Sequence, residues 1–278
     1  MRLRNQLLRL LAALLLAAGL FVLKEQRAHA DDLATIRQRG TLLVGVKTDY
    51  PPFGFRLPSG EIVGIEPALA ADVAKSLGVK LELVPVSISN RIALLRQGKV
   101  DLLIATMNDT LARRQEVTVV KPFYYAAGFN VMVLKSMHLQ SWAELKGKPV
   151  CGIQGAYYNY EATTSLGLQV TAFDGPAEAL AALKAGRCVG LLYDDTAIEG
   201  EMLDPAWRDY EMPLRVREVQ PWGLAVRNDQ PEWAAYLSGV VKKWAKDGTI
   251  VDLETQYHVR HSGFAADAHE RASKSYGN

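Results

Sequence analysis

The sequence has few of the residues, and none of the short motifs, on which most catalytic and metal sites depend. Its 278 residues include only two cysteines and five histidines. It has no G-x-S-x-G nucleophile elbow, no phosphate-binding loop and no H-E-x-x-H zinc motif. His258 and His261 stand near the end of the chain, where chance explains the pair better than a metal site does. We therefore expect no metal and no cofactor, although these absences exclude enzymes only in part.

Long apolar runs are also scarce, because the chain has one and it lies at the beginning. Three arginines precede an apolar run over residues 10–23, and the A-x-A site Ala28-His29-Ala30 follows it. This order is typical of a secretory signal peptide at residues 1–30, and the run is short for a bilayer of about 30 Å. The alternative is an uncleaved anchor, which the charged residues after the run favour slightly. No cysteine lies near this site, so lipid attachment there is excluded.

Cleavage would change the charge of the protein. The chain carries 32 basic and 30 acidic residues, and five of the basic and one of the acidic side chains lie in residues 1–30. The mature chain is left with 27 basic and 29 acidic residues, a net charge of about −2. We therefore expect a periplasmic protein with no nucleic-acid partner.

The two cysteines, Cys151 and Cys188, stand in the middle of the chain. In an exported protein two cysteines most simply form one disulfide. Two buried free thiols are the alternative, because sequence alone does not give the distance between them. If both residues begin adjacent parallel strands, the bridge would brace that part of the fold without a redox role.

Strand-like and helix-like patterns alternate from residue 41 onward. The first series has strands at 41–46, 80–86 and 100–106, with helices at 66–78 and 89–98. A second series has strands at 130–134, 150–154, 169–173 and 188–194, with helices beginning near 141, 157 and 176. A strand-like stretch at 216–227 and helices at 231–246 and 249–257 follow them. Such series predict sheets of mostly parallel strands.

Two α/β units that are joined twice predict two lobes around a cleft. The chain crosses between them near 123–130 and 218–223, so residues 31–125 plus 222–260 would form lobe one and 126–221 lobe two. The expected fold class is α/β, with a mostly parallel sheet flanked by helices in each lobe and two hinge crossings. Residues 261–278 lack periodicity, and we expect a flexible tail there.

Polar residues gather where the strands of both units end. Thr106, Asn108 and Arg113 follow one strand, and Asp194 ends another. Ligands in open α/β sheets bind at such ends. A free amino acid would suit them, because Arg113 can bind its carboxylate through charge-assisted hydrogen bonds and Asp194 its ammonium. The alternatives are a solvated helix charge for Arg113 and a helix cap for Asp194.

The sequence resembles the polar amino-acid group of periplasmic solute-binding proteins that serve ABC transporters. The resemblance covers roughly residues 40–258 and depends on the order of several short pieces. These are VGVKTDYPPFGF, the G-x-x-x-G-I-E from Gly60 to Glu66, LLRQGKVDLLIA, the T-x-x-R from Thr110 to Arg113, PFYYAAG, YDDT and PWGLAVR. The resemblance implies a hinged type II periplasmic-binding-protein fold that closes on one amino acid.

The resemblance also implies roles for single residues. It assigns Arg113 to the α-carboxylate, Asp194 to the α-ammonium, and Thr106 and Asn108 to further ligand contacts. The sequence departs from the family at Ala156-Tyr157-Tyr158, where the usual motif has hydroxyl residues, and at Ala68, where it has an acid. At Tyr157 and Tyr158 the hydroxyl contact is therefore in doubt, while backbone N–H contacts near the start of a helix can survive.

Three more residues bear on the choice of amino acid. Lys47 and Arg91 stand where glutamate- or aspartate-binding relatives have basic residues, so the resemblance implies an acidic ligand. The alternative is that both pair with Asp49, Glu66 or Asp109 at the rim. Tyr50 would form an aromatic wall of the pocket or belong to the core.

The partners that the resemblance implies are a small amino acid and an ABC permease at the inner membrane, and we expect a monomer. Two other functions stay open. Some proteins of this fold are periplasmic dehydratases of the prephenate or arogenate type, for which Glu161 would be a candidate general acid. A ligand-sensing module is the other possibility, although a second membrane segment is missing from the sequence.

Overall fold

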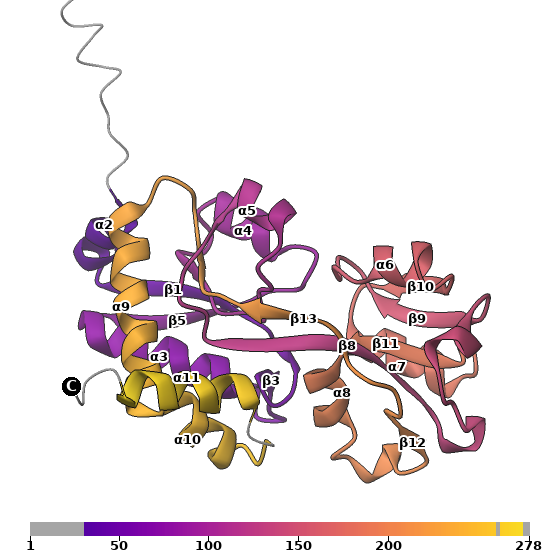
Figure 1. Ribbon diagram of the computed structural model, residues 1–278. Helices are drawn as coiled ribbons and strands as arrows, with labels where there is room; N and C mark the ends of the chain where they lie inside the picture. The colour runs from indigo at the N-terminus through magenta and orange to yellow at the C-terminus, as the bar shows by residue number, and fades with distance from the viewer. Residues whose placement is uncertain (1–30, 260–261, 275–278) are drawn as a thin grey trace, which may run out of the picture.

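The computed structural model describes residues 31–259 and 262–274, and two sheets form the cores of two lobes (Figure 1). In lobe one the strand order is β5-β1-β6-β14-β7. β1 is parallel to β5 and β6, whereas β14 runs antiparallel to β6 and β7. The bounds are β1 Thr41–Val46, β5 Lys80–Pro85, β6 Leu102–Leu103, β7 Thr118–Val119 and β14 Ala225–Val226.

Helices flank the first sheet, and a small three-stranded sheet lies beside it. The helices are α2 Asp32–Arg39, α3 Ile65–Leu77, α4 Arg91–Arg96, α5 Leu111–Glu116, α9 Pro231–Asp247, α10 Thr249–Gln256 and α11 Gly263–Lys274. The small sheet consists of β2 Asp49–Tyr50, β3 Gly54–Arg56 and β4 Ile62–Val63. As expected, helix α3 has Pro67 in its first turn and is capped at its C-terminus by Gly78, whose φ of 70° is in the left-handed region that favours glycine.

The sheet of lobe two has the order β10-β9-β11-β8-β12, and β13 pairs with β8. β9 is parallel to β10 and β11, and β8 is antiparallel to its neighbours. The bounds are β8 Tyr125–Leu134, β9 Pro149–Ile153, β10 Gln169–Phe173, β11 Gly190–Asp194, β12 Tyr210–Glu211 and β13 Arg217–Trp222. The helices are α6 Asn159–Thr164, α7 Pro176–Lys184 and α8 Asp195–Glu201, and the 3-10 turns are η1 Lys135–Met137, η2 Trp142–Leu145 and η3 Pro205–Trp207.

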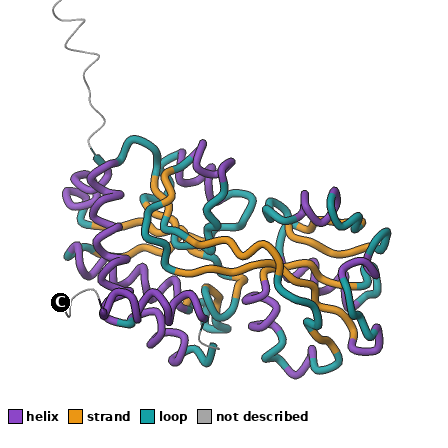
Figure 2. Tube along the Cα trace, in the orientation of Figure 1, coloured by secondary structure: helices purple, strands orange, loops and turns teal. Residues whose placement is uncertain are grey.

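Two antiparallel strands connect the lobes. β8 and β13 run side by side from one lobe into the other, as the continuous strand trace in Figure 2 shows. The pairing of Trp222 with Tyr125 lies at the lobe-one end of this ribbon, and Arg217 pairs with Phe129 further into lobe two. These are the two crossings that the sequence predicts, and the α/β two-lobed fold class is confirmed. The residue boundaries of the lobes stay a prediction.

Each sheet is mostly parallel in strand direction, as expected, but it contains one antiparallel strand that the sequence does not predict. In each lobe three neighbouring strands are parallel, and the strand that runs against them is β14 in lobe one and β8 in lobe two. The sequence patterns show where strands lie but not the direction in which a returning strand enters the sheet. β6 is also shorter than the expected 100–106, and Thr106, just beyond its end, has a φ of 49°.

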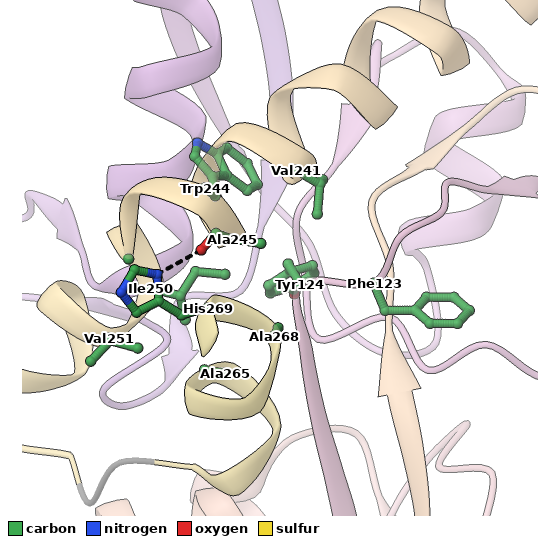
Figure 3. A pocket seen from close by; sticks show the side chains of 11 residues that line it. Phe123, Tyr124, Val241, Trp244, Ala245, Ile250, Val251, Ala265, Ala268 and His269 are labelled. Atoms are coloured by element: carbon green, nitrogen blue, oxygen red, sulfur yellow. Dashed lines mark hydrogen bonds between the residues drawn. The ribbon is translucent and has the colours of Figure 1, made fainter. Parts of the chain in front are cut away.

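The expected loose tail is wrong for most of its length, because residues 263–274 form helix α11. Ala265 is buried, and Figure 3 shows Ala265, Ala268 and His269 lying against residues of α9 and α10. The Nδ1 atom of His269 lies 2.8 Å from the carbonyl oxygen of Ala245, near the end of α9. Phe264 is the only apolar side chain of α11 larger than alanine, so the sequence gives a weak signal for this helix.

Some expectations concern residues that the structure does not describe. The signal peptide at residues 1–30 and His261 lie outside the described residues. Within the described ranges, none of the helices has the length and apolar character that crossing a membrane requires.

Candidate ligand-binding site

A small, narrow cavity lies between the two lobes. Seven of the nine predicted site residues line it together with two apolar residues that the prediction missed. Lobe one contributes Ile88, Arg91, Thr106, Asn108 and Arg113, and lobe two contributes Ala156, Tyr157, Tyr158 and Asp194. The structure therefore brings predicted site residues that are up to 103 positions apart in the sequence, Arg91 and Asp194, to one cavity.

Arg113 reaches the cavity from the short helix α5. Thr110 caps this helix, because its hydroxyl accepts a hydrogen bond from the backbone N–H of Arg113 at 3.3 Å. The Nη1 atom of Arg113 donates to the backbone and side-chain oxygens of Asn108 at 3.0 and 3.1 Å. Burial, with a further contribution from Arg91, lowers the pKa of Arg113 to about 9. The side chain of Arg113 is thus a buried cation. The solvated helix charge is the next residue, Arg114, which pairs with Asp109.

Asp194 reaches the cavity from the opposite lobe, at the end of β11. Its Oδ2 atom accepts a hydrogen bond from the hydroxyl of Tyr50 at 3.1 Å. Its Oδ1 atom is buried and has no hydrogen-bond partner among the described residues. Asp194 precedes helix α8, but its side chain makes no capping hydrogen bond, so the helix-cap alternative is not supported. Burial raises the pKa of Asp194 to about 7, although the Tyr50 hydrogen bond lowers it.

Arg91 is a second buried cation in the wall of the cavity. Its side chain is 1% exposed. Its Nη1 atom donates to the carbonyl oxygens of Ala105 and Thr106, the latter at 3.1 Å. Its Nε atom has no hydrogen-bond partner in the described part of the chain. Desolvation lowers the pKa of Arg91, and the nearby carboxylates of Asp194 and Glu66 raise it.

Lys47 and Tyr50 are not among the residues that line the cavity. Lys47 is 1% exposed, and its Nζ atom lies 2.6 Å from Oδ1 of Asp49, which is one of the pairings left open as an alternative. Burial lowers the pKa of Lys47, and Asp49 raises it. Tyr50 is fully buried and donates or accepts a hydrogen bond with the hydroxyl of Thr196 at 2.8 Å, besides its bond to Asp194. Tyr50 therefore contacts the cavity residue Asp194 from behind, whereas Lys47 pairs with Asp49.

The two tyrosines of lobe two differ in their surroundings. The hydroxyl of Tyr157 donates to the carbonyl oxygen of Glu218 in β13, at 2.6 Å. The ring of Tyr158 packs on Phe129, with 5.1 Å between centroids, and its hydroxyl is buried without a hydrogen-bond partner in the described ranges. Helix α6 begins at Asn159, slightly later than expected.

Polar atoms without partners gather around this cavity. Most buried polar atoms in proteins have a hydrogen-bond partner, so a cluster of exceptions marks a place where a ligand can bind. In the described residues four such atoms belong to the cavity lining, namely Nε of Arg91, Nδ2 of Asn108, the hydroxyl of Tyr158 and Oδ1 of Asp194. The three donors suit an anion and Oδ1 suits a cation, so the cavity is complementary to a small zwitterion.

The residues around the cavity give less support to a dehydratase site or to a metal site. Glu161, the candidate general acid of a dehydratase, forms a salt bridge of 2.8 Å with Arg217 and is not among the lining residues. Within the described ranges, His, Cys, Asp and Glu side chains form no group of three or more that could hold a metal ion.

Cys151 in β9 and Cys188 just before β11 form a disulfide, which confirms that prediction. Their Cα atoms are 5.6 Å apart, inside the usual range for such a bridge. Neither cysteine lines the cavity. The disulfide ties together two strands whose other ends carry Ala156 to Tyr158 and Asp194.

Comparison with known proteins agrees with this geometry. Residues 42–260 match the family of bacterial extracellular solute-binding proteins, family 3, and the chain belongs to that family. It is 31% identical over 263 residues to the ABC transporter glutamine-binding protein of Bacillus subtilis, in an alignment that covers 89% of this chain and 93% of the relative. The resemblance noted from the sequence motifs is confirmed.

Solved structures share the two-lobed fold. The cysteine-binding protein of Campylobacter jejuni has a TM-score of 0.78 and 25% identity, over 85% of this chain and 98% of that structure. An ancestral amino acid-binding protein, described as a precursor of cyclohexadienyl dehydratase, has a TM-score of 0.73 and 29% identity, over 81% of this chain and 99% of that structure.

Proposed function

We propose that this protein is the extracytoplasmic binding component of an amino-acid ABC transporter and captures a polar L-amino acid by closing its two lobes. The observation that carries the proposal is the pair Arg113 and Asp194, which come from opposite lobes and line one cavity. Arg113 binds the α-carboxylate and Asp194 the α-ammonium. A single amino acid satisfies both charges only when the lobes are together, so binding and closure are one event.

The finer part of the proposal is that the side chain of the ligand is acidic. Arg91 and Arg113 give the cavity lining two positive charges against the single negative charge of Asp194. Once Arg113 and Asp194 are matched by the main-chain groups of the ligand, Arg91 remains for a second carboxylate. Glu66 lies close enough to Arg91 to offset part of this charge. Lys47 contributes less than the resemblance implies, because Asp49 already neutralises it.

The same proposal includes the place and partners of the protein. A secreted binding protein of this family would work in the periplasm and deliver its ligand to a permease at the inner membrane, as a monomer. The relatives support the transporter role, since one is named as an ABC transporter glutamine-binding protein and another as a cysteine-binding protein. Their different ligands show that the identity of the amino acid must be measured on this protein.

Calorimetric titration of the mature protein with glutamate, aspartate, glutamine and asparagine tests both parts. We expect each acid to bind at least about tenfold more tightly than its amide, a difference of about 1.4 kcal/mol. Arg113→Ala should weaken every ligand by several hundred-fold, because removing one partner of a buried charge pair costs roughly 3–5 kcal/mol. Lys47→Met is the matched control, since it removes a buried cation that Asp49 already pairs, and it should change affinities only a few-fold.

The outcomes separate the two parts of the proposal. Tighter binding of the amides would reject the acidic side chain and keep the amino-acid site. An unchanged affinity in Arg113→Ala would reject the site itself. Turnover of prephenate or arogenate by the wild-type protein would favour the alternative function, a dehydratase. One structurally similar protein is an ancestral precursor of such an enzyme.

A further inference from the structure

The carboxylate of Glu66 is fully buried behind the cavity and is not one of its lining residues. Its Oε1 atom accepts two short hydrogen bonds, from the backbone N–H of Thr106 at 2.6 Å and from the hydroxyl of Tyr124 at 2.5 Å. Burial raises the pKa of Glu66 to about 7, and these two hydrogen bonds lower it. A buried carboxylate is unfavourable unless hydrogen bonds compensate for the water it has lost. The two hydrogen bonds of Glu66 do this, and they also connect it to two functional parts of the protein.

Thr106, the first of these two partners, connects Glu66 to the cavity. Its φ of 49° is in the left-handed region, which is unfavourable for a β-branched residue. In this conformation its N–H points to Glu66, while its carbonyl oxygen and hydroxyl lie 3.1 and 3.4 Å from Nη1 of Arg91. Thr106 and Arg91 both line the cavity. The hydrogen bond from Thr106 to Glu66 thus fixes the backbone whose carbonyl oxygen accepts a hydrogen bond from the guanidinium of Arg91.

Tyr124 connects the same carboxylate to the hinge. It immediately precedes β8, and its backbone N–H donates to the carbonyl oxygen of Trp222 at the end of β13, at 3.0 Å. Its ring is held by lobe one, because it lies with Val241, Trp244 and Ala268 around a small apolar cavity (Figure 3). One carboxylate oxygen therefore joins the start of a hinge strand to a cavity residue.

We propose that Glu66 is a positioning residue of the ligand site. Its carboxylate holds Thr106 in the left-handed conformation that the cavity requires, and through Tyr124 it ties this conformation to the hinge. The proposal deepens the amino-acid-binding function and rests on it for its ligand. It assigns Glu66 no contact with the ligand, so the residue acts through Thr106 and Arg91.

Two neighbouring tyrosines provide a matched pair of variants. Tyr124→Phe removes a buried hydroxyl that donates to Glu66, whereas Tyr125→Phe removes an equally buried hydroxyl that donates to Glu254 at 2.8 Å. Both should lower Tm. Only Tyr124→Phe should also weaken the amino acid that binds most tightly to the wild type, by roughly five- to tenfold, and Tyr125→Phe should stay within twofold.

Substitutions of Glu66 itself distinguish positioning from plain stability. Glu66→Gln keeps an oxygen that can accept from Thr106 and Tyr124, so it should retain most of the affinity. Glu66→Leu fills a similar volume without an acceptor, and affinity should fall at least about tenfold. A residue that only stabilises the fold would lower Tm in both variants and leave the affinity of the folded protein unchanged.

Amide hydrogen exchange of Thr106, followed by NMR in unliganded protein, gives a readout that does not depend on the ligand. Protection of this N–H should be high in the wild type and in Tyr125→Phe, and it should fall in Tyr124→Phe and in any folded Glu66→Leu. Unchanged protection, or affinities of Tyr124→Phe and Tyr125→Phe that agree within twofold, would overturn the proposal. A wild-type protein that binds no amino acid would instead reject the proposed function, and the exchange of Thr106 would still decide the role of Glu66.

Discussion

At the scale of single residues, Asp194 shows how a binding group can lower the stability of the unliganded protein. Its carboxylate is buried, only one of its oxygens has a hydrogen-bond partner among the described residues, and its pKa is about 7. The folded-state pKa is above the value of an exposed aspartate, so the folded protein binds a proton more tightly than the unfolded chain does. The ionised form therefore destabilises the fold increasingly as pH rises towards and through 7.

This charge gives ligand binding a defined pH dependence. An ammonium group favours ionised Asp194, so the pKa of Asp194 in the complex is lower than about 7, its value without ligand. We expect calorimetric affinity to be constant between about pH 7 and pH 8, below the pKa of about 9 of Arg113, and to fall towards lower pH by up to about tenfold per unit. Asp194→Asn should abolish this dependence and weaken binding, and it should raise the Tm of the unliganded protein at pH 8. The pKa of Glu66 is also about 7, so Glu66→Gln, which should keep the dependence, is the control.

The same scale shows which site residues a sequence can predict. Arg113 and Asp194 follow apolar strands, and the ends of parallel strands meet at one edge of a sheet, so their convergence could be expected. Lys47 could not be assigned in this way, because its pairing with Asp49 depends on side-chain directions within a short turn. Ile88 and Ala156 were missed because an apolar side chain carries no signal that separates a cavity wall from a core.

At the scale of elements, the disulfide braces the part of lobe two that carries its share of the cavity. Cys151 and Cys188 are 37 positions apart and join β9 to the segment just before β11. β9 leads to Tyr157 and Tyr158, and β11 ends at Asp194. A bridge of this length stabilises by about 4 kcal/mol on the chain-entropy model. The bridge lies away from the cavity, so it should affect stability more than affinity.

Replacement of both cysteines by serine tests this role. We expect the Tm of the double variant Cys151→Ser/Cys188→Ser to fall by roughly 8–16 °C, from about 4 kcal/mol at roughly 2–4 °C per kcal/mol. Ligand affinity at 25 °C should stay within a few-fold, because the cavity residues are unchanged. Calorimetric scans of the wild type with and without reductant are the control, since reduction should reproduce the loss. Equal Tm values would show that the bridge does not brace the lobe.

Elements differ in how well a sequence predicts them, and α3 and α11 illustrate the range. Helix α3 has proline in its first turn, glycine at its end and apolar residues four apart, so its bounds agree with the expected 66–78 within a residue. Helix α11 buries Ala265, and Phe264 is its only apolar side chain larger than alanine, so it lacks the large apolar residues that mark α3. Its position is decided by contacts with distant residues, which include the carbonyl oxygen of Ala245.

At the scale of the whole molecule, the lobes touch across the cleft through polar groups. Tyr50 of lobe one bonds to Asp194 and Thr196 of lobe two, at 3.1 and 2.8 Å. β8 and β13 are the strands that pair between the lobes, and a two-stranded ribbon bends more easily than a full sheet. Arg113 and Asp194 remain on separate bodies, with no salt bridge between them. A ligand that bridges these two charges therefore favours the closed arrangement over an open one.

Small-angle scattering of the mature protein should detect this closure directly. We expect the radius of gyration to decrease when the tightest-binding amino acid is added at saturation, because the ligand binds to both lobes only when they are together. Arg113→Ala at the same ligand concentration is the control, and its radius should stay at the unliganded value because its lobe-one charge is missing. Tyr50→Phe removes the hydrogen bonds to Asp194 and Thr196 and leaves Arg113 and Asp194 in place. It therefore distinguishes closure caused by a ligand that bridges the two charges from closure caused by direct contact between the lobes. An unchanged radius in saturated wild-type protein would contradict the hinge mechanism, and binding would then have to occur in lobes that are already closed.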